Sequence, residues 1–195
     1  MRQAAAHRRE DERRRHGVLR ESEPGPGQNG PMARETSEAF QDRYPDDVAH
    51  CFGCGRLNAH GHQLKSYWDG EETVARFTPE PYHTAIPGYV YGGLVASLID
   101  CHGTGTAAAV AARHEGIEPD AAAGSVAFPR FVTAALEVSY LAPTPLGPTL
   151  ELRGKVVQES ERKVTTEITV VANGEITARG RVVAVRMPER MLGGT

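Results

Sequence analysis

The chain has 195 residues and a formal net charge of -3 at pH 7, which argues against a nucleic-acid-binding protein because such proteins need a surplus of Lys and Arg. Its three cysteines are too few for a disulfide framework and favour a reducing, cytoplasmic compartment. We find neither an apolar run of about 18 residues nor the apolar region of a signal peptide, so no membrane partner is expected.

Residues 1–35 are expected to form a disordered N-terminal extension. This stretch is rich in Arg, carries Pro-Gly repeats at 24–27 and holds almost no residue that needs burial. A basic arm for nucleic acid or membrane is the other interpretation, but interspersed Glu and Asp dilute the charge. Met32 is an alternative start of the natural chain. A single folded domain is expected over 36–190, followed by a flexible tail at 191–195.

The folded part is expected to begin with a short helix within 36–49. A compact loop follows at 51–55 (CFGCG), which contains two cysteines, two glycines and one aromatic residue. Two short strands are expected at 63–69 and 72–78. The Asp-Gly pair at 69–70 lies between them and is typical of a tight hairpin turn.

The helical pattern is clearest between residues 90 and 113. Its apolar stripe, in which His102 is expected to be a core histidine, consists of Leu94, Val95, Leu98, Ile99 and His102. The other side carries small residues that permit close approach, namely Ala96, Gly103 and Ala107. Asp100 is the only formally ionised residue of this helix before Arg113.

The remainder alternates like antiparallel sheet. Residues of one face, mostly apolar, recur at every second position over 136–140, 150–156 (with Gly154) and 164–170 (with Thr166), and the last strand is expected at 176–185. The Asn-Gly pair at 173–174 is the strongest tight-turn pair of the chain. One long helix between a short hairpin and several long strands predicts an α+β fold, an antiparallel β-sheet wrapped around one central α-helix.

Three segments resemble one known family. PGYVYGGLVASLID at 87–100 resembles the central-helix motif of hotdog thioesterases of the phenylacetate-pathway type. CFGCG at 51–55 resembles their leading segment, and VTAALEVSY at 132–140 with PTPLG at 143–147 resembles the strand after the helix. The similarity covers about 50–187 in the same motif order. It implies a hotdog fold, a homo-oligomer (dimer or dimer of dimers) and hydrolysis of an acyl- or aryl-thioester such as acyl-coenzyme A.

Thioester hydrolysis needs a base for a water molecule and donors for the developing oxyanion. Asp100 is the candidate base, because burying a lone carboxylate raises its pKa. The other interpretation is a solvated Asp, although a solvated helix face normally carries several charges. Gly92 and Gly93 are candidate oxyanion donors, since the first N–H groups of a helix have no intrahelical acceptor; close packing of the helix start is the alternative. In the resembling family the first glycine supplies this donor.

Gly92 and Asp100 are eight residues apart, about 12 Å along a helix. A single helix cannot bring both to one reacting centre. Two antiparallel helices from two subunits can, with the small face of Ala96, Gly103 and Ala107 allowing the approach. We therefore expect a site shared across a dimer and an inactive monomer.

Three further residues are candidates for the site. Thr133 matches a position where the family often has a hydroxyl, although strict alternation places it off the face of Leu136 and a β-branched residue suits any strand. His83 lies in a loop before the helix, where it either polarises the substrate carbonyl or is structural. Tyr91 stands where the family usually has His; it can bind substrate through its hydroxyl but offers no imidazole.

No metal or other cofactor is expected. A zinc site at Cys51 and Cys54, completed by nearby histidines, is the alternative, but a single C-x-x-C is a weak signal and here belongs to the resemblance. Cys101 has no histidine partner that would make it a nucleophile. Tyr91 in place of His keeps a second function open, a hotdog protein that binds acyl-coenzyme A without hydrolysing it. A hotdog dehydratase or hydratase fits less well, because its Asp/His pattern is absent.

Overall fold

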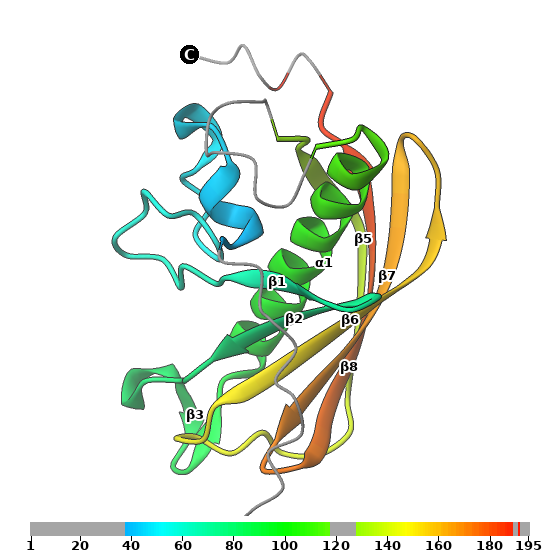
Figure 1. Cartoon of the computed structure of the whole chain (residues 1–195). Helices are drawn as coiled ribbons and strands as arrows, with labels where there is room; N and C mark the ends of the chain where they lie inside the picture. The colour runs from blue at the N-terminus through cyan, green and yellow to red at the C-terminus, as the bar shows by residue number, and fades with distance from the viewer. Residues whose placement is uncertain (1–37, 118–127, 189–190, 192–195) are drawn as a thin grey trace, which may run out of the picture. The chain divides into compact units, whose positions relative to one another are not determined.

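The computed structural model describes residues 38–117, 128–188 and 191. The extension expected at 1–35 and most of the tail expected at 191–195 lie outside the described residues. Within them, one α-helix, α1 (Gly92–His114), packs on a six-stranded antiparallel sheet (Figure 1). In spatial order the strands are β1 (Ser66–Asp69), β2 (Glu72–Phe77), β6 (Leu150–Glu159), β7 (Lys163–Ala172), β8 (Glu175–Arg186) and β5 (Phe131–Tyr140). The predicted α+β fold is confirmed.

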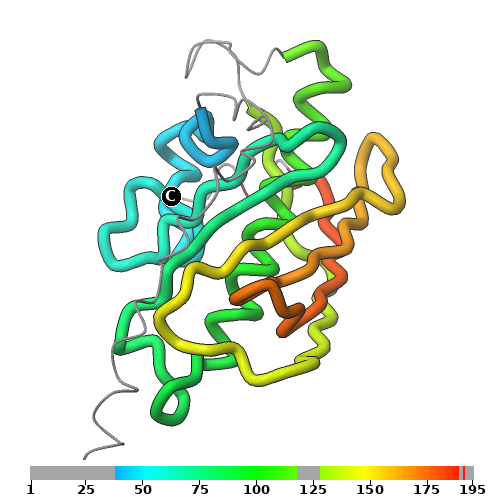
Figure 2. Tube along the Cα trace, turned by 60° about the horizontal axis from the view of Figure 1, so that its bottom comes forward, coloured from blue at the N-terminus to red at the C-terminus, as the bar shows by residue number. Residues whose placement is uncertain are grey.

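The hairpins arise where the sequence placed its turn residues. Gly70 adopts a φ of 64° between β1 and β2. Asn173 and Gly174 have φ values of 51° and 80° between β7 and β8, so both central residues of this two-residue turn lie in the left-handed region. The trace in Figure 2 passes from β6 through β7 to β8 by short hairpin connections. The strand order places β5, ten residues long, at one edge of the sheet.

Helix α1 supplies the centre of the core. The predicted apolar stripe is buried throughout, and His102 is fully buried with it. A Cβ on Gly103 would lie 2.6 Å from the Val182 side chain, and one on Gly180 would lie 2.3 Å from Ile99, so these glycines let helix and sheet approach closely. The helix is long and apolar enough to cross a membrane. However, 72% of its most apolar stretch of 18 residues is buried inside the protein, as in the core helix of a folded domain.

Two local expectations differ from the structure. The helix expected within 36–49 is instead two 3-10 turns, η1 (Phe40–Arg43) and η2 (Asp46–Val48). Pro45 separates them, because the residue before a proline is disfavoured in the helical region and Tyr44 is accordingly extended. In the stretch before α1 the chain forms a 3-10 turn, η3 (Pro81–His83), and a short hairpin that the sequence did not indicate. The hairpin comprises β3 (Thr84–Ile86) and β4 (Tyr89–Val90).

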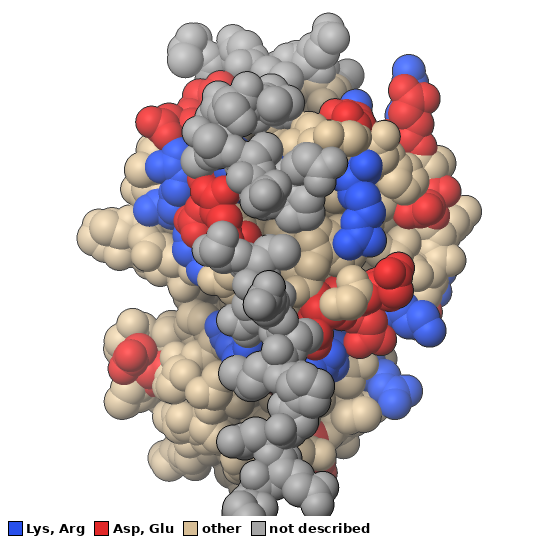
Figure 3. Space-filling view, in the orientation of Figure 1, with Lys and Arg blue, Asp and Glu red and all other residues tan. Residues whose placement is uncertain are grey.

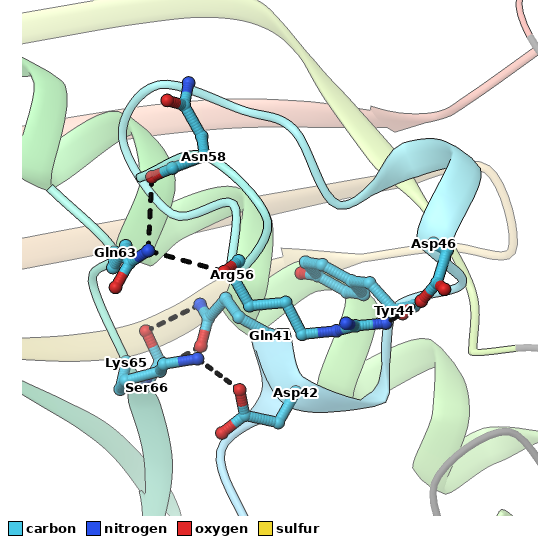
Figure 4. A network of polar contacts seen from close by, with 9 residues as sticks. All are labelled: Gln41, Asp42, Tyr44, Asp46, Arg56, Asn58, Gln63, Lys65 and Ser66. Atoms are coloured by element: carbon cyan, nitrogen blue, oxygen red, sulfur yellow. Dashed lines mark hydrogen bonds and ion pairs between the residues drawn. The ribbon is translucent and has the colours of Figure 1, made fainter. Parts of the chain in front are cut away.

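Side-chain hydrogen bonds fix the loop that precedes β1 (Figure 4). Arg56 donates to the backbone oxygen of Tyr44 at 3.1 Å and pairs with Asp46. The Gln63 amide donates to the backbone oxygens of Arg56 and Asn58 at 3.3 and 3.1 Å. These bonds tie the loop to η1 and η2 and define its conformation.

The charged surface is mixed in sign. On the face shown in Figure 3, Lys and Arg side chains are interspersed with Asp and Glu outside the grey atoms. Arg153 illustrates the pattern, since it pairs with Asp69 at 2.9 Å and with Glu151 at 2.8 Å.

Candidate active site

The outer side of α1 carries the candidate base. Its partly exposed stripe is made of small or polar residues, namely Gly93, Ala96, Ser97, Asp100 and Thr104. The small face expected from the sequence is corrected here: Gly103 and Ala107 are buried within the protomer, with Gly103 against Val182. Of the three small residues named for it, only Ala96 belongs to the outer stripe. The helix therefore offers a different narrow face for close approach, and Asp100 lies on it.

Thr133 on β5 donates a hydrogen bond from its hydroxyl to the Asp100 carboxylate. Strict alternation placed Thr133 off the face of Leu136, but the structure places both on the face toward α1. Thr133 pairs with Ala184 and Leu136 with Val182, and both partners are buried. The register shifts between Thr133 and Ala135, so a β-bulge inserts one residue and changes the parity.

The environment of Asp100 favours its neutral form. Partial burial raises the pKa of the carboxyl above its ordinary value, which is the largest effect. The Thr133 hydrogen bond acts in the opposite direction and lowers the pKa, while the nearby Cys51 raises it further. A carboxylate with a raised pKa that remains partly exposed is suited to accept a proton from water.

Gly92 and Gly93 lie in the first turn of α1, as the sequence predicted. Tyr91 is the N-cap residue but makes no side-chain cap, and its ring lies over Gly93, where a Cβ would be 2.4 Å away. The Tyr140 hydroxyl donates to the backbone oxygen of Gly92 at 2.8 Å. Tyr140 thus fixes the helix start against β5, a role that sequence reasoning missed and for which only its alternation within the strand gave any signal.

An open groove of about 550 Å³ begins at Gly92. Its walls include several apolar side chains that remain largely exposed, namely Ile86, Tyr89, Tyr140 and Leu141. Apolar side chains that gather around a concave surface in this way mark a site for an apolar ligand or partner. Gly92, the first residue of α1, is among the residues that line the groove.

His83 is held in a structural arrangement. Its Nδ1 accepts a hydrogen bond from the backbone N–H of Glu80 at 2.9 Å, which leaves the proton of the neutral ring on Nε2. Its ring contacts His62 and Phe77 at centroid distances of 5.4 and 5.5 Å. The His83 backbone oxygen accepts from Tyr91 N–H at 2.8 Å, so the residue supports the helix start through its main chain.

Within one protomer these residues form two groups. Asp100 and Thr133 are in direct contact, while Gly92, Gly93 and Tyr91 lie two turns earlier on α1 with Tyr140 beside them. Eight residues of helix separate Gly92 from Asp100, about 12 Å. The fold therefore does not bring donor and base together inside a single chain.

Comparison with known proteins identifies the family of the stretch that carries these residues. The family model described as "Thioesterase superfamily" matches residues 87–179, a stretch that contains the helix start, Asp100 and Thr133. The chain is 53% identical to a thioesterase superfamily protein from Shewanella loihica PV-4, with a TM-score of 0.54, over 67% of this chain and 96% of that one. No curated protein compared with the chain matches it.

Two other solved structures are similar. A second thioesterase superfamily protein is 25% identical with a TM-score of 0.51, covering 70% of this chain and 60% of that one. A mutant of the phenylacetic acid degradation protein PaaI from Thermus thermophilus is 23% identical with a TM-score of 0.48, covering 64% of this chain and 93% of that one. Helix, sheet and the 53% relative together show that the chain belongs to the thioesterase superfamily and has its hotdog fold.

Proposed function

We propose that the protein hydrolyses acyl- or aryl-thioesters, with coenzyme A as the carrier, in a site shared by two subunits. The observation that carries this proposal is the Asp100 carboxylate. It lies on the partly exposed stripe of α1, receives a hydrogen bond from Thr133 and has a pKa raised by burial. A merely solvated Asp would have neither the desolvation nor the fixed partner.

In the proposed mechanism Asp100 accepts a proton from a water molecule, and the water oxygen attacks the thioester carbonyl carbon. The carbonyl oxygen then carries negative charge, and the N–H groups at Gly92 and Gly93 of a second subunit stabilise it. Collapse of the tetrahedral intermediate breaks the carbon–sulfur bond. The departing thiolate takes the proton from Asp100, which leaves a free acid, a free thiol and the starting carboxylate.

The uncovered side of β5 supports a second subunit. Leu136 and Tyr140 lie on the sheet face toward α1, yet their side chains are 39% and 54% exposed. β5 is also an edge strand, and a long edge with free backbone groups pairs readily with another strand. A second copy paired along β5 would lengthen the sheet and bring its own α1 toward Asp100.

The substrate arrangement follows from the groove at Gly92. An acyl or aryl group in this groove contacts Tyr140 and Leu141, and its thioester carbonyl reaches the helix start. Tyr91, 59% exposed, contributes a hydroxyl at the mouth in place of an imidazole. Three free cysteines accord with the reducing, cytoplasmic setting we propose for the reaction.

Release of free thiol from a panel of acyl- and aryl-coenzyme A thioesters tests the activity. Asp100→Ala is expected to lower turnover by about a hundredfold or more. Glu137→Gln is the matched control, because Glu137 is an exposed carboxylate on β5 that pairs across the strands with Arg181. Equal losses in both variants would contradict the assignment of the base.

Mixed dimers test the shared site. Asp100→Asn chains and Gly92→Val chains are each expected to be inactive, since Gly92 has an ordinary φ and the valine acts by blocking the helix start. A shared site gives the mixed dimer one intact centre, so mixing restores activity to about half of the wild-type value per mixed dimer. If both groups act within one chain, mixing restores nothing.

The alternative function is a hotdog protein that binds an acyl-thioester without hydrolysing it. The observation that favours it is Tyr91 at the helix start, where no imidazole is available. Binding of acyl-coenzyme A by the wild type without thiol release, unchanged in Asp100→Asn, would select this function.

A further inference from the structure

Three cysteine side chains lie close together where the loop that precedes β1 contacts α1. Cys51 and Cys54 belong to this loop, and Cys101 comes from α1, about fifty residues later in the sequence. Their sulfur atoms all lie within 4.8 Å of one another, and Cys51 Sγ is 3.8 Å from Cys101 Sγ. Cys54 and Cys101 are buried, whereas Cys51 is exposed.

We propose that Cys51, Cys54 and Cys101 form a binding site for one Zn²⁺ ion, with three thiolate ligands from the protein and a solvent molecule in the fourth position. The inference is independent of the proposed hydrolase activity, because it rests on the sulfur geometry and the loop that carries it. It adds a metal site where the sequence, with one C-x-x-C pair, gave only a weak signal.

The separation of the Cys51 and Cys101 sulfurs fits a shared metal ion, and the other two separations lie below 4.8 Å. Zinc–sulfur bonds of about 2.3 Å in tetrahedral geometry place neighbouring sulfurs about 3.8 Å apart, which is the separation of Cys51 and Cys101. A disulfide would require about 2.05 Å. All three cysteines are free thiols in the structure. A disulfide joins only two sulfurs, so it would leave the third of these neighbouring cysteines unused.

The loop is built to stabilise negative charge on sulfur. Hydrogen bonding by the Cys101 and Cys54 thiols, and then by the backbone of Cys54 and Gly53, holds the pKa of the Cys51 thiol well below its ordinary value. A Cβ on Gly53 would lie 2.2 Å from Cys101 Sγ, so only glycine lets the loop approach the helix this closely. Gly55 N–H donates to the Cys51 backbone oxygen at 2.7 Å and closes the turn between the two cysteines. These backbone bonds act as the supporting contacts that orient metal ligands in known sites.

Contacts outside the cysteines hold the loop in the same place. The bonds of Arg56 and Gln63 drawn in Figure 4 fix its later half. Arg130 lies near Cys54, so a cation partly balances the negative charge of a three-thiolate zinc centre. The ligands are thus positioned before the ion binds, which lowers the ordering cost of binding.

The fourth position faces solvent at Cys51. Across the residues that the structure describes, no His, Asp or Glu joins the three sulfurs as a fourth close ligand. The sequence suggested nearby loop histidines as further metal ligands beside Cys51 and Cys54. In the structure Cys101 takes the place of these histidines as the third ligand. Since Cys101 follows Asp100 directly, the ion would fasten the loop to the helix turn that carries the candidate base.

Zinc uptake by the reduced, metal-free full-length protein tests the site. Calorimetric titration with ZnCl₂ is expected to give one ion per chain, and Co²⁺ is expected to give a sulfur-to-metal charge-transfer band of the intensity of three thiolates. Cys51→Ser, Cys54→Ser and Cys101→Ser are each expected to weaken Zn²⁺ binding by at least about tenfold. His60→Ala, a change in the same loop, is the matched control and is expected to bind zinc as the wild type does.

Thiol protection in the wild type covers the case in which a serine variant fails to fold. With one equivalent of Zn²⁺ the alkylation of all three cysteines is expected to slow together and to recover when a chelator is added. Stoichiometric binding lost in His60→Ala but kept in Cys101→Ser would overturn the site. So would absence of zinc uptake together with a loss of two hydrogen atoms in mass on mild oxidation, which would make the cluster a disulfide-forming group instead.

Discussion

Asp100 and His102 lie two residues apart on α1, on opposite sides of the helix and in opposite environments. His102 faces the sheet and is fully buried. Asp100 faces outward, is only partly buried and has one side-chain partner, Thr133. Both are titratable groups withdrawn at least in part from water, and they differ in the extent of their burial and in their hydrogen bonds.

The inner group belongs to a complete chain of hydrogen bonds. Gln41 donates to Ser66 Oγ at 3.1 Å, and Ser66 Oγ lies within hydrogen-bond distance of His102 Nδ1, at 2.9 Å. His102 Nε2 lies 3.2 Å from Thr73 Oγ1, which lies 2.7 Å from Thr106 Oγ1. Thr106 donates back to the His102 backbone oxygen at 2.9 Å. Each of these five side chains, Gln41, Ser66, His102, Thr73 and Thr106, has a hydrogen-bond partner within this network, as buried polar groups require.

Burial moves the two pKa values in opposite directions because it disfavours charge in both groups. It lowers the pKa of His102 to about 4 and raises the pKa of Asp100. His102 stays neutral and satisfied and serves the fold. Asp100 has a raised pKa and, among the side chains that the structure describes, a hydrogen bond only from Thr133, so its carboxylate retains the capacity to take a proton from water. The difference teaches that satisfaction of hydrogen bonds separates a structural titratable group from a reactive one on the same helix.

The largest effect is expected on the inner side. His102→Ala should lower the free energy of unfolding by about 3 kcal/mol, because it leaves a cavity and removes the partner of two buried hydroxyls. Urea unfolding monitored by circular dichroism measures the loss. Asp100→Ala is the comparison variant and should change stability by less than about 1 kcal/mol. Equal losses would mean that the two sides of α1 do not differ as argued.

The pH dependence of stability sharpens the same prediction. The unfolded chain binds a proton at His102 near pH 6.5, whereas the folded chain resists it down to about pH 4. Part of the wild-type stability is therefore present above pH 6.5 and lost as the pH falls toward 4. His102→Ala should lack this part, so the two unfolding curves should approach each other on acidification.

An intermediate effect is expected at Thr133. Thr133→Val removes the hydrogen bond that lowers the pKa of Asp100, so that pKa should rise further. We expect about a tenfold loss of kcat/KM at neutral pH and a shift of the acid limb of its pH profile to higher pH. Thr133→Ser keeps the hydroxyl and should restore both. A valine variant with an unshifted acid limb would show that Thr133 does not act on the base.

The sequence predicted the elements whose residues carry strong local signals. The hairpin turns followed from Asp-Gly and Asn-Gly pairs, and the buried stripe with His102 followed from helical periodicity. The 3-10 turns around Pro45 were misjudged because a short polar segment has no periodicity to separate one helical type from another. Thr133 was placed on the wrong face because a β-bulge depends on pairing with β8, which one strand read alone does not contain.

The candidate site was partly accessible in the same way. Asp100 stood out because no other charged residue precedes Arg113 on the helix. Gly103 and Ala107 were predicted on the outer face because both are small. Small size alone does not show whether a residue allows close approach of another subunit or of the protein's own sheet. The contact of Tyr140 with Gly92 and the approach of Cys101 to Cys51 join distant parts of the chain, and only the fold reveals them.

The smallest expected effect is a gain in stability at Asp100. The folded-state pKa of this carboxyl is raised above the unfolded value of about 3.9, so the folded chain holds the proton to higher pH. The folded state therefore loses stability relative to the unfolded state as the pH rises through the folded-state pKa, because Asp100 then ionises in a partly buried place. Asp100→Asn removes this cost while its amide oxygen still accepts from Thr133. We expect up to about 1 kcal/mol of added stability at neutral pH.

The added stability should vanish below about pH 3.9, where Asp100 is protonated in both states. Thermal unfolding at matched pH values, with Glu137→Gln as the exposed control, measures the difference. A loss of stability at neutral pH, or a gain that does not depend on pH, would show that the carboxylate is held for the fold as His102 is. Stability gained together with activity lost is the signature expected of a group kept charged for its reaction.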